Sequence, residues 1–225
     1  MIAVIDYGAG NLRNVCKALD FIGADIVLTD QPAEIERADK VVLPGVGAFA
    51  DCMQGLQKRD LLEPLMDFAH SGRPFLGICV GMQLLFDVGE EMGEWPGLGL
   101  IPGRVVKFKF ASASVPATSH QPPPASSQPP AATSHPLKIP HIGWNQVEAQ
   151  RADHPILRDV TPDGYAYFVH SFHAKTAEPS YTITTTHYGY DFPSVVAKDN
   201  VWGIQFHPEK SQDVGLQMLK NFIDL

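Results

Sequence analysis

The chain has 225 residues, with 17 Lys and Arg against 25 Asp and Glu, and so a formal net charge of −8 at neutral pH. This length allows one compact domain or two small ones, with enough residues to bury a sizeable core. The acidic balance argues against binding along a phosphate backbone, which requires clustered basic side chains. Nucleic acid is therefore not an expected partner.

The apolar segments and the cysteines indicate a cytoplasmic protein rather than a membrane or secreted one. No apolar run reaches the ~18 residues of a membrane span, and the opening MIAVID lacks the basic segment of a signal peptide. Cys16, Cys52 and Cys79 are odd in number, far apart and without a C-x-x-C pair. Neither a disulfide framework nor a thiolate metal site is indicated, and we expect no cofactor.

The first hundred residues alternate Val- and Ile-rich runs with segments of helical period, which predicts βα units around a parallel sheet. Cys16 and Cys52 fall on the apolar faces of two of these helical segments and are interpreted as core residues. Expected strands cover residues 2–5, 25–28, 41–43 and 75–78, and expected helices cover residues 11–22, 48–56, 61–69 and 80–86.

From about Gly103 the pattern changes to short apolar runs with little helix between them, until a final amphipathic stretch over residues 213–223. The fold predicted is therefore α/β, with a mostly parallel central sheet flanked by helices and a β-rich C-terminal half. Strands in this half are expected at residues 105–110, 166–171, 181–186, 194–197 and 202–206.

Residues 111–136 belong to neither half. They hold 7 Pro, 6 Ser and 6 Ala without a single charge, a composition that cannot form a core. We interpret them as a disordered surface insertion, with a Pro-rich docking peptide as the alternative. The remainder of residues 1–225 is then a single domain.

The sharpest local motif is GICVG at residues 77–81, where an apolar strand meets a helical segment. Small residues two before and two after Cys79 are what a strained nucleophile elbow requires. The elbow would place the sulfur beside a helix N-terminus, which favours the thiolate. The alternative is a buried structural cysteine between turn glycines.

A second motif, QFHPE at residues 205–209, follows another apolar run. In extended chain, His207 and Glu209 share a face, so the carboxylate can orient the imidazole as a base for a thiol. A third segment, LPGVGAF at residues 43–49, can present backbone N–H groups to an oxyanion together with the amide of Val80, or can be a plain turn.

Together, GICVGMQ, PGVG and HPEKS resemble the class I (triad) glutamine amidotransferases. Within that family, DYGAGNL at residues 6–12, IPHIGWN at 139–145 and YFVHSF at 167–172 resemble the glutaminase subunits of imidazole glycerol phosphate synthases. The resemblance covers nearly the whole chain except residues 111–136.

The resemblance implies a role for each matching residue. Cys79 would attack the side-chain amide of glutamine, His207 would protonate the departing ammonia and then activate water, and Glu209 would orient His207. Glutamate and ammonia would form through a γ-glutamyl thioester. The oxyanion hole would comprise the backbone at Val80, Gly45, Val46 and Gly47, and glutamine would be held by Gln83 and the backbone around His170 and Ser171.

The resemblance also implies a partner, a cyclase subunit with a (β/α)₈ barrel that receives the ammonia. This cyclase would make imidazole glycerol phosphate and an aminoimidazole carboxamide ribotide in histidine synthesis. Asn11, Arg13 and Trp144 are candidates for that interface, Trp144 because large aromatics anchor interfaces, although core packing would equally suit it.

No metal site is expected, because the spacing of His170 and His173 on extended chain places their rings on opposite faces. For His141, packing is the default interpretation, with contact to the pocket or interface as the alternative. Two other functions stay open, namely a triad glutaminase that serves another acceptor, as in pyridoxal phosphate synthesis, and a non-catalytic or thiol-sensing module on the same fold.

Overall fold

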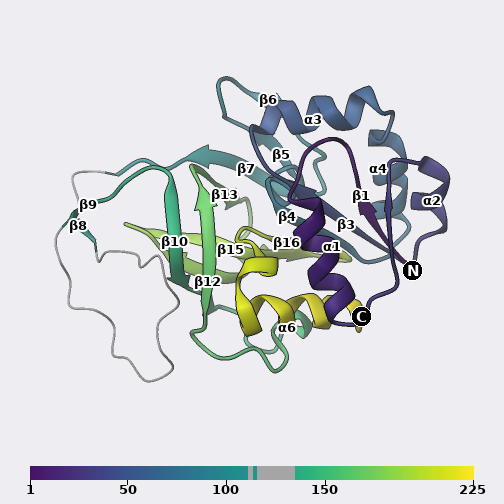
Figure 1. Ribbon diagram of the computed structural model, residues 1–225. Helices are drawn as coiled ribbons and strands as arrows, with labels where there is room; N and C mark the ends of the chain where they lie inside the picture. Colours follow the sequence, from purple (N-terminus) through teal and green to yellow (C-terminus); the bar gives the residue numbers. More distant parts are fainter. Residues whose placement is uncertain (111–113, 116–134) are drawn as a thin grey trace.

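The computed structural model describes residues 1–110, 114–115 and 135–225. A central eight-stranded sheet runs through the molecule in the order β11-β14-β15-β16-β4-β3-β1-β2 (Figure 1). Its strands are β1 (Ile2–Ile5), β2 (Ile26–Thr29), β3 (Lys40–Gly45), β4 (Phe75–Cys79), β11 (Glu148–Ala149), β14 (Thr182–His187), β15 (Asp191–Lys198) and β16 (Val201–Ile204).

The sheet has a parallel part and an antiparallel edge. Strands β2, β1, β3, β4 and β16 are mutually parallel, whereas β15, β14 and β11 continue the sheet in antiparallel fashion. The parallel strands β1, β3 and β4 are almost entirely buried on both faces, as their continuous Val, Ile and Leu runs require. The predicted α/β fold is confirmed.

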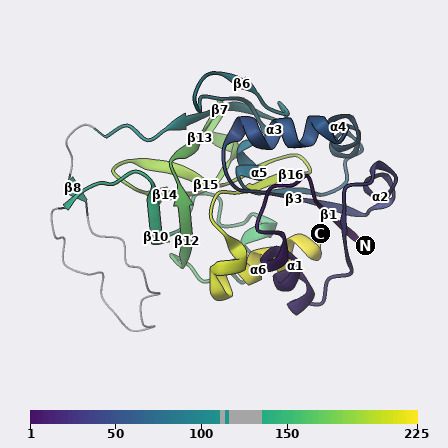
Figure 2. The same cartoon turned by 45° about the horizontal axis from the view of Figure 1, so that its top comes forward.

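Helices cover both faces of this sheet. In Figure 2, α3 (Phe49–Lys58) and α4 (Leu62–His70) lie above the parallel strands, and α1 (Leu12–Phe21) and α6 (Gln212–Ile223) lie below them. The short α2 (Pro32–Arg37), which the sequence analysis did not predict, packs against α4.

Smaller β structures accompany the central sheet, and two of them meet at one residue. Strand β12 runs up to Ser171 as part of a ribbon, and beyond Ser171 the chain enters a second sheet of order β13-β7-β5-β6. These strands are β5 (Phe86–Gly89), β6 (Trp95–Pro96), β7 (Ile101–Lys107), β10 (His141–Gln146), β12 (Tyr165–His170) and β13 (Phe172–Thr176), accompanied by 3₁₀ turns η1 (Pro155–Leu157), η2 (Pro179–Tyr181) and η3 (Pro208–Lys210).

One predicted helix is much shorter than expected. The helical segment after Cys79 was expected to reach residue 86, but α5 covers only Val80–Gln83 and β5 begins at Phe86. The run from Leu84 to Phe86 is uniformly buried, and a short apolar run of that kind has no period that separates helix from strand. Phe86 pairs with Ile101 of β7, and this pairing makes the segment from Phe86 a strand rather than a continuation of the helix.

The predicted insertion at residues 111–136 lies outside the described residues, apart from β8 (Ser114–Val115) and β9 (His135–Pro136), which pair with each other. Within the ranges that the structure describes, no helix is both long and apolar enough to cross a membrane.

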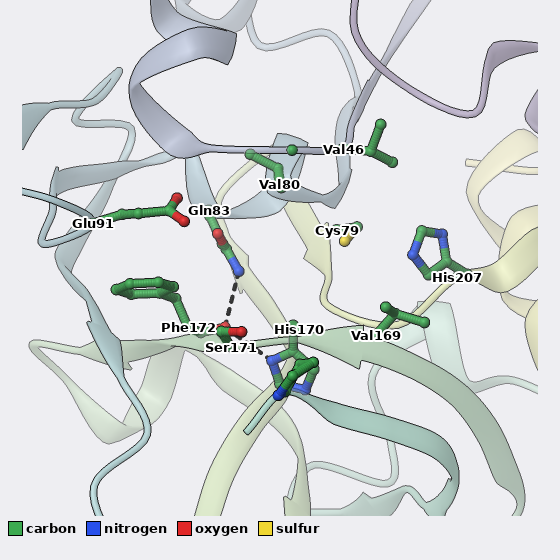
Figure 3. Close-up of a pocket in the computed structure, with 12 residues that line it drawn as sticks. Val46, Cys79, Val80, Gln83, Glu91, Val169, His170, Ser171, Phe172 and His207 are labelled. Carbon is green, nitrogen blue, oxygen red and sulfur yellow. Dashed lines mark hydrogen bonds between the residues drawn. The ribbon is translucent and has the colours of Figure 1, made fainter. Parts of the chain in front are cut away.

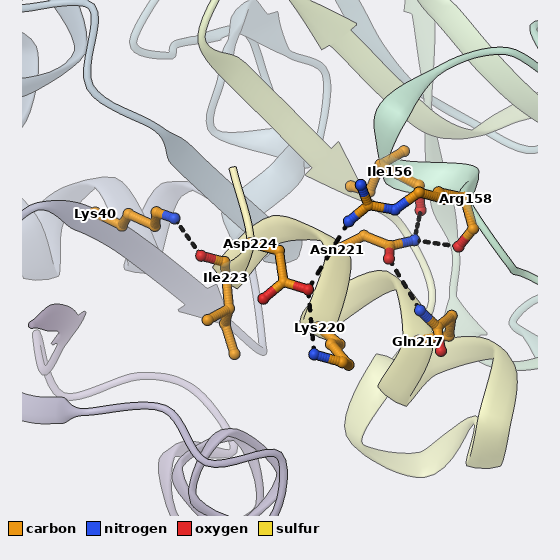
Figure 4. A network of polar contacts seen from close by, with 8 residues as sticks. All are labelled: Lys40, Ile156, Arg158, Gln217, Lys220, Asn221, Ile223 and Asp224. Carbon is orange, nitrogen blue, oxygen red and sulfur yellow. Dashed lines mark hydrogen bonds and ion pairs between the residues drawn. The ribbon is translucent and has the colours of Figure 1, made fainter.

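A buried asparagine ties α6 to the loop that precedes β12 (Figure 4). The Asn221 side chain, 2% exposed, donates to the carbonyl oxygens of Ile156 at 2.9 Å and Arg158 at 2.7 Å. Its own oxygen accepts from Gln217 at 2.9 Å. Nearby, Lys40 donates to the Ile223 carbonyl, so α6 is anchored at several points below the sheet.

Replacing Asn221 with Ala is expected to lower the free energy of unfolding by about 2–3 kcal/mol, because the buried Ile156 carbonyl and the partly buried Arg158 carbonyl lose their donor. Gln217→Ala serves as the control and should cost less than about 1 kcal/mol, since it removes a single partly exposed contact. Urea denaturation measures both values. Equal destabilisation by the two substitutions would contradict this account of α6.

Candidate active site

The register of three parallel strands gathers the sequence-predicted catalytic segments at one edge of the sheet. In β3 and β4, Gly45 lies opposite Cys79, and in β16 and β4, Ile204 lies opposite Ile78. Because the carboxyl ends of parallel strands share an edge, the loop after β3, the end of β4 and the segment after β16 converge there. Residues far apart in sequence are thereby brought together.

The end of β4 has the form of a nucleophile elbow. Cys79 has φ +56° and ψ −113°, a conformation that L residues rarely adopt. A side chain at Gly81 would place its Cβ 1.8 Å from the Leu43 carbonyl oxygen, and one at Gly77 would lie 2.5 Å from the Gly81 oxygen. Only glycine fits at either position, which is the physical reason for the spacing read from the sequence.

Cys79, His207 and Glu209 form a connected triad. The Nδ1 atom of His207 lies 3.0 Å from Oε1 of Glu209, and the interaction with the Cys79 thiol is the largest of the effects that raise the pKa of the imidazole. In Figure 3 the sulfur and the ring face each other across the edge of the pocket. The side chains of His207 and Glu209 are 7% and 0% exposed.

The local geometry of this triad differs from the expectation. The sequence predicts extended chain over residues 207–209, but Pro208 begins the 3₁₀ turn η3, a first position that suits the fixed φ of proline. The turn folds Glu209 back onto the ring of the extended residue His207, so the two side chains meet by turn closure rather than by strand alternation.

The electrostatics of the triad favour a proton on the imidazole. Burial alone would lower the pKa of His207, but hydrogen bonds and charge interactions with Cys79 and Glu209 raise it to about 10. Burial likewise would raise the pKa of Glu209, yet the hydrogen bond and charge of His207 lower it. The site therefore favours an imidazolium beside the Cys79 sulfur, a partner that stabilises negative charge on a cysteine nucleophile.

The same shifts define a pH window for stability. The Glu209 contribution is present above its ordinary pKa of 4.5 and is lost as the pH falls through the lowered value. The His207 contribution is complete below its ordinary pKa of 6.5 and is lost as the pH rises through about 10. Both contributions are complete only between pH 4.5 and 6.5.

Two contacts that support the triad were not foreseen. Asn11, predicted as an interface residue, donates from Nδ2 to Oε1 of Glu209 at 3.1 Å. Ser211, 1% exposed, donates to the His207 carbonyl at 2.7 Å and accepts from the Tyr167 amide at 2.9 Å. The N-terminus of α1 and strand β12 thus fix the position of η3.

A cavity of about 290 Å³ opens beside the sulfur, with most of the predicted binding residues around it. It also has one carboxylate that the sequence analysis missed, Glu91, whose Oε2 accepts from the Phe49 amide at 2.8 Å. The lining residues are Val46, Gly47, Cys79, Val80, Gln83, Glu91, Pro140, Val169, His170, Ser171, Phe172 and His207.

Gln83 has a defined orientation in the cavity wall. Its Nε2 donates to the Phe172 carbonyl at 3.0 Å and to Oε1 of Gln205 at 3.1 Å. Both amide hydrogens are thereby used inside the protein, and the carbonyl end is turned toward Val80 (Figure 3). Gln83 can therefore offer an acceptor, but no further donor, to a bound molecule.

The predicted oxyanion loop lies beside Cys79. Val46 and Gly47 line the cavity together with Val80, whereas Gly45 is buried behind them, where a Cβ would lie 2.5 Å from the Gly81 nitrogen. Two donors hold the loop from within the core, in contacts that the sequence analysis did not predict. The Tyr7 hydroxyl donates to the Pro44 carbonyl at 2.7 Å and the Cys52 thiol donates to the Val46 carbonyl at 3.4 Å.

The histidines of the β-rich half do not converge on an ion. His170 and His173 were expected on opposite faces, but the chain turns at Ser171 and both rings pack on Phe108, with centroids 5.1 and 4.7 Å away. Each ring Nδ1 bonds a backbone carbonyl instead. Among the described residues, no three His, Cys, Asp or Glu side chains form a group that could hold a metal.

The remaining interface candidates differ in exposure. Arg13 is exposed at the start of α1, whereas Trp144 is only 8% exposed and packs edge-on against Tyr167, with ring centroids 5.9 Å apart. Most of the Trp144 surface is thus already used within the chain.

Comparison with known proteins places this chain in a family. Residues 3–225 match the family described as glutamine amidotransferase class-I. Two solved structures from Thermotoga maritima share the fold at low identity, PurLQS (TM-score 0.69, 15% identity, covering 99% of this chain and 97% of that one) and a glutamine amidotransferase (TM-score 0.54, 16%, 92% and 75%). The chain belongs to the class-I glutamine amidotransferases and is an enzyme subunit of that class.

The relatives that are most similar in sequence include subunits of one enzyme within this family. The imidazole glycerol phosphate synthase subunit HisH of Salinibacter ruber is 47% identical over 225 residues, which cover 100% of this chain and 94% of that protein. The subunit of the same name from Syntrophotalea carbinolica is 46% identical over 225 residues and is covered completely, as is this chain. Similarity therefore extends along the entire chain.

Replacing Glu209 with Gln is expected to lower the pKa of His207, because the carboxylate charge that stabilises the imidazolium is lost. In the unmodified protein the ring should stay protonated beyond about pH 8, since its pKa is about 10. NMR titration of nitrogen-15-labelled histidine measures both. Glu91→Gln, on the far side of the cavity (Figure 3), is the control, and an unchanged His207 titration in Glu209→Gln would contradict the assignment.

Proposed function

We propose that this chain is the glutaminase subunit of an imidazole glycerol phosphate synthase, and that it hydrolyses glutamine to glutamate and ammonia. The single observation that carries the proposal is the connection of Cys79 through His207 to Glu209 at the edge of a 290 Å³ cavity. The relatives named HisH support the synthase assignment. Residues 1–225 form one amidotransferase domain in this proposal, with residues 111–136 as an insertion.

The reaction proceeds in two acyl transfers. The Cys79 thiolate attacks the side-chain carbon of glutamine, and the imidazolium of His207 gives its proton to the departing nitrogen, which leaves as ammonia. A γ-glutamyl thioester remains on the sulfur. Neutral His207 then takes a proton from water, whose oxygen displaces the sulfur to release glutamate, and Glu209 stabilises the imidazolium that re-forms.

The oxyanion that develops on the amide oxygen needs backbone donors close to the sulfur. The amide of Val80 directly follows the nucleophile, and Val46 and Gly47 line the same side of the cavity. Removing one such donor typically costs ~10²–10³ in rate. The contacts of Tyr7 and Cys52 to this loop restrict where its peptide groups can point.

The opposite wall has the groups that a free amino acid requires. Glu91 offers a carboxylate to the α-ammonium group, and the Gln83 oxygen can accept from the same group or from the substrate amide. Backbone at His170 and Ser171 completes the wall. This combination of acceptors suits the ammonium group of a free amino acid and the N–H groups of a carboxamide.

The cavity mouth supports a protein partner. Val46, Ile139 and Val169 are large apolar residues that are 38%, 39% and 36% exposed at or next to this mouth. Exposed apolar side chains that gather at one place mark an interaction surface, and ammonia released into water near neutral pH would be protonated and unreactive. In the proposed complex a (β/α)₈-barrel cyclase covers the mouth, receives the ammonia and makes imidazole glycerol phosphate and an aminoimidazole carboxamide ribotide.

We also propose a cytoplasmic location for this reaction. Cys16, Cys52 and Cys79 are all free thiols, which is the usual state of cysteine in the reducing cytoplasm.

Cys79→Ala is expected to reduce glutamate release from glutamine by at least ~10³-fold in the presence of the cyclase subunit and its nucleotide ligand, because the nucleophile is lost. Cys16→Ala changes a partly buried thiol on α1 and should leave the rate unchanged. A coupled glutamate assay measures both. Persistent turnover by the Cys79 variant would remove the nucleophile assignment.

Ile139→Asp is expected to weaken association with the cyclase subunit by at least about tenfold, since a charge would be buried at the apolar rim. Phe21→Asp provides a matched control, because Phe21 is 78% exposed at the distal end of α1. Isothermal titration of each variant with the cyclase gives the dissociation constants. Equal binding by both variants would place the interface elsewhere.

A further inference from the structure

A pair of buried histidines supports the proposed glutamine wall, because His170 lines the cavity and His141 lies behind His170. His141 on β10 lies opposite His170 on β12 in the antiparallel ribbon, and its Nδ1 is 3.0 Å from Nε2 of His170. His141 is 0% and His170 6% exposed. Burial lowers the pKa of His141 to about 2 and that of His170 to about 3, so both rings are neutral near pH 7.

Neutral imidazoles have one donor and one acceptor nitrogen, and the contacts of this pair allow only one assignment. Nδ1 of His170 lies 2.9 Å from the Phe172 carbonyl, an acceptor, and must therefore carry the hydrogen. Its Nε2 is then an acceptor, so Nδ1 of His141 must be the donor to it. Nε2 of His141 in turn accepts from the Asn145 amide at 3.3 Å.

This series of hydrogen bonds ends at the Phe172 carbonyl oxygen, which also fixes the side chain of Gln83. The Phe172 carbonyl accepts from His170 and from Nε2 of Gln83, so both of its lone pairs are used. Losing the His170 donor would leave one lone pair of the Phe172 carbonyl without a partner and would loosen the hold of that carbonyl on the Gln83 amide. Both Phe172 and Gln83 line the cavity. The shape and polarity of the wall therefore depend on which histidine donates in the hydrogen bond between His141 and His170.

We propose that His141 is a positioning residue for glutamine binding: by donating to His170 it holds that ring in the tautomer that fixes the Phe172 carbonyl and, through it, the Gln83 amide. The inference rests on the proposed function of the cavity as a glutamine site. His141 does not line the cavity, and it acts through His170.

Two substitutions separate the hydrogen bond from the packing of the ring. His141 stacks on Tyr188 and Phe168, with centroids 4.0 and 4.9 Å away. His141→Phe keeps an aromatic ring in this stack and loses the donor, whereas His141→Asn places an amide donor near the position of Nδ1 and loses the ring.

Steady-state glutaminase kinetics with the cyclase subunit and its nucleotide ligand test the proposal. His141→Phe should raise KM for glutamine about tenfold, the size expected for one buried hydrogen bond, with kcat within about threefold. His141→Asn should restore KM to within about threefold of the unmodified enzyme. An unchanged KM in His141→Phe, a loss in both variants alike, or a fall in kcat alone would each overturn the proposal.

His173→Phe is the matched control. His173 is a buried histidine in the same aromatic cluster, 5% exposed, but it bonds Ala174 and Tyr190 and does not line the cavity. Its KM for glutamine should not change. If the unmodified enzyme releases no glutamate, the proposed function fails; if it does and His141→Phe behaves normally, only the role of His141 fails.

A spectroscopic measurement keeps the test decisive if a variant does not fold. In the unmodified protein, nitrogen-15 NMR of labelled histidine should show that the rings of His141 and His170 are neutral from about pH 6 to 8. Each ring should have its single N–H hydrogen on Nδ1. In folded His141→Phe, the His170 signal should shift toward a mixture of tautomers. Protonation of either ring at Nε2 in the unmodified protein would overturn this series of hydrogen bonds.

Discussion

The site depends on the close approach of three backbone segments at the carboxyl edge of the parallel sheet. At Gly45, Gly77 and Gly81 an added Cβ would lie within 2.5 Å of a backbone atom, so β3, β4 and the start of α5 touch without intervening side chains. This contact forces Cys79 out of the sheet at positive φ and places the Val46 loop beside it. The adjacent strand β16 then brings His207 to the other side of the sulfur.

Burial makes the charges of His207 and Glu209 depend on each other. With Glu209 fully buried and His207 nearly so, neither charge could persist there alone, because desolvation opposes both. Each is sustained by the other, the imidazolium also by the Cys79 thiol, and Asn11 adds a donor to the carboxylate. The proton on His207 is therefore a property of the assembled site rather than of the histidine.

Much of the fold and the core of the site were predictable because local patterns encode them. Apolar runs located the central strands, and the glycine spacing around Cys79 reflects a clash that acts within a few residues. The early end of α5 and the start of strand β5 were not predicted, because an all-apolar run has no period. The roles of Glu91 and His141 were missed because they arise from tertiary pairing with residues distant in sequence, for which a single sequence offers no signal.

The two halves of the chain supply different electrostatics to one cavity. The parallel half and β16 provide the strained thiol and the imidazolium, whereas the ribbon of β10 and β12 provides a wall whose histidines are neutral. These features are coupled, because the charge of His207 is among the causes that lower the pKa of His170. A proton on His170 would repel the one on His207 and would also reverse the donor direction toward His141. Burial, which is the main cause of the lowered His170 pKa, therefore also avoids a repulsion of the protonated base, and this is a physical reason to bury His170 and His141 as a pair.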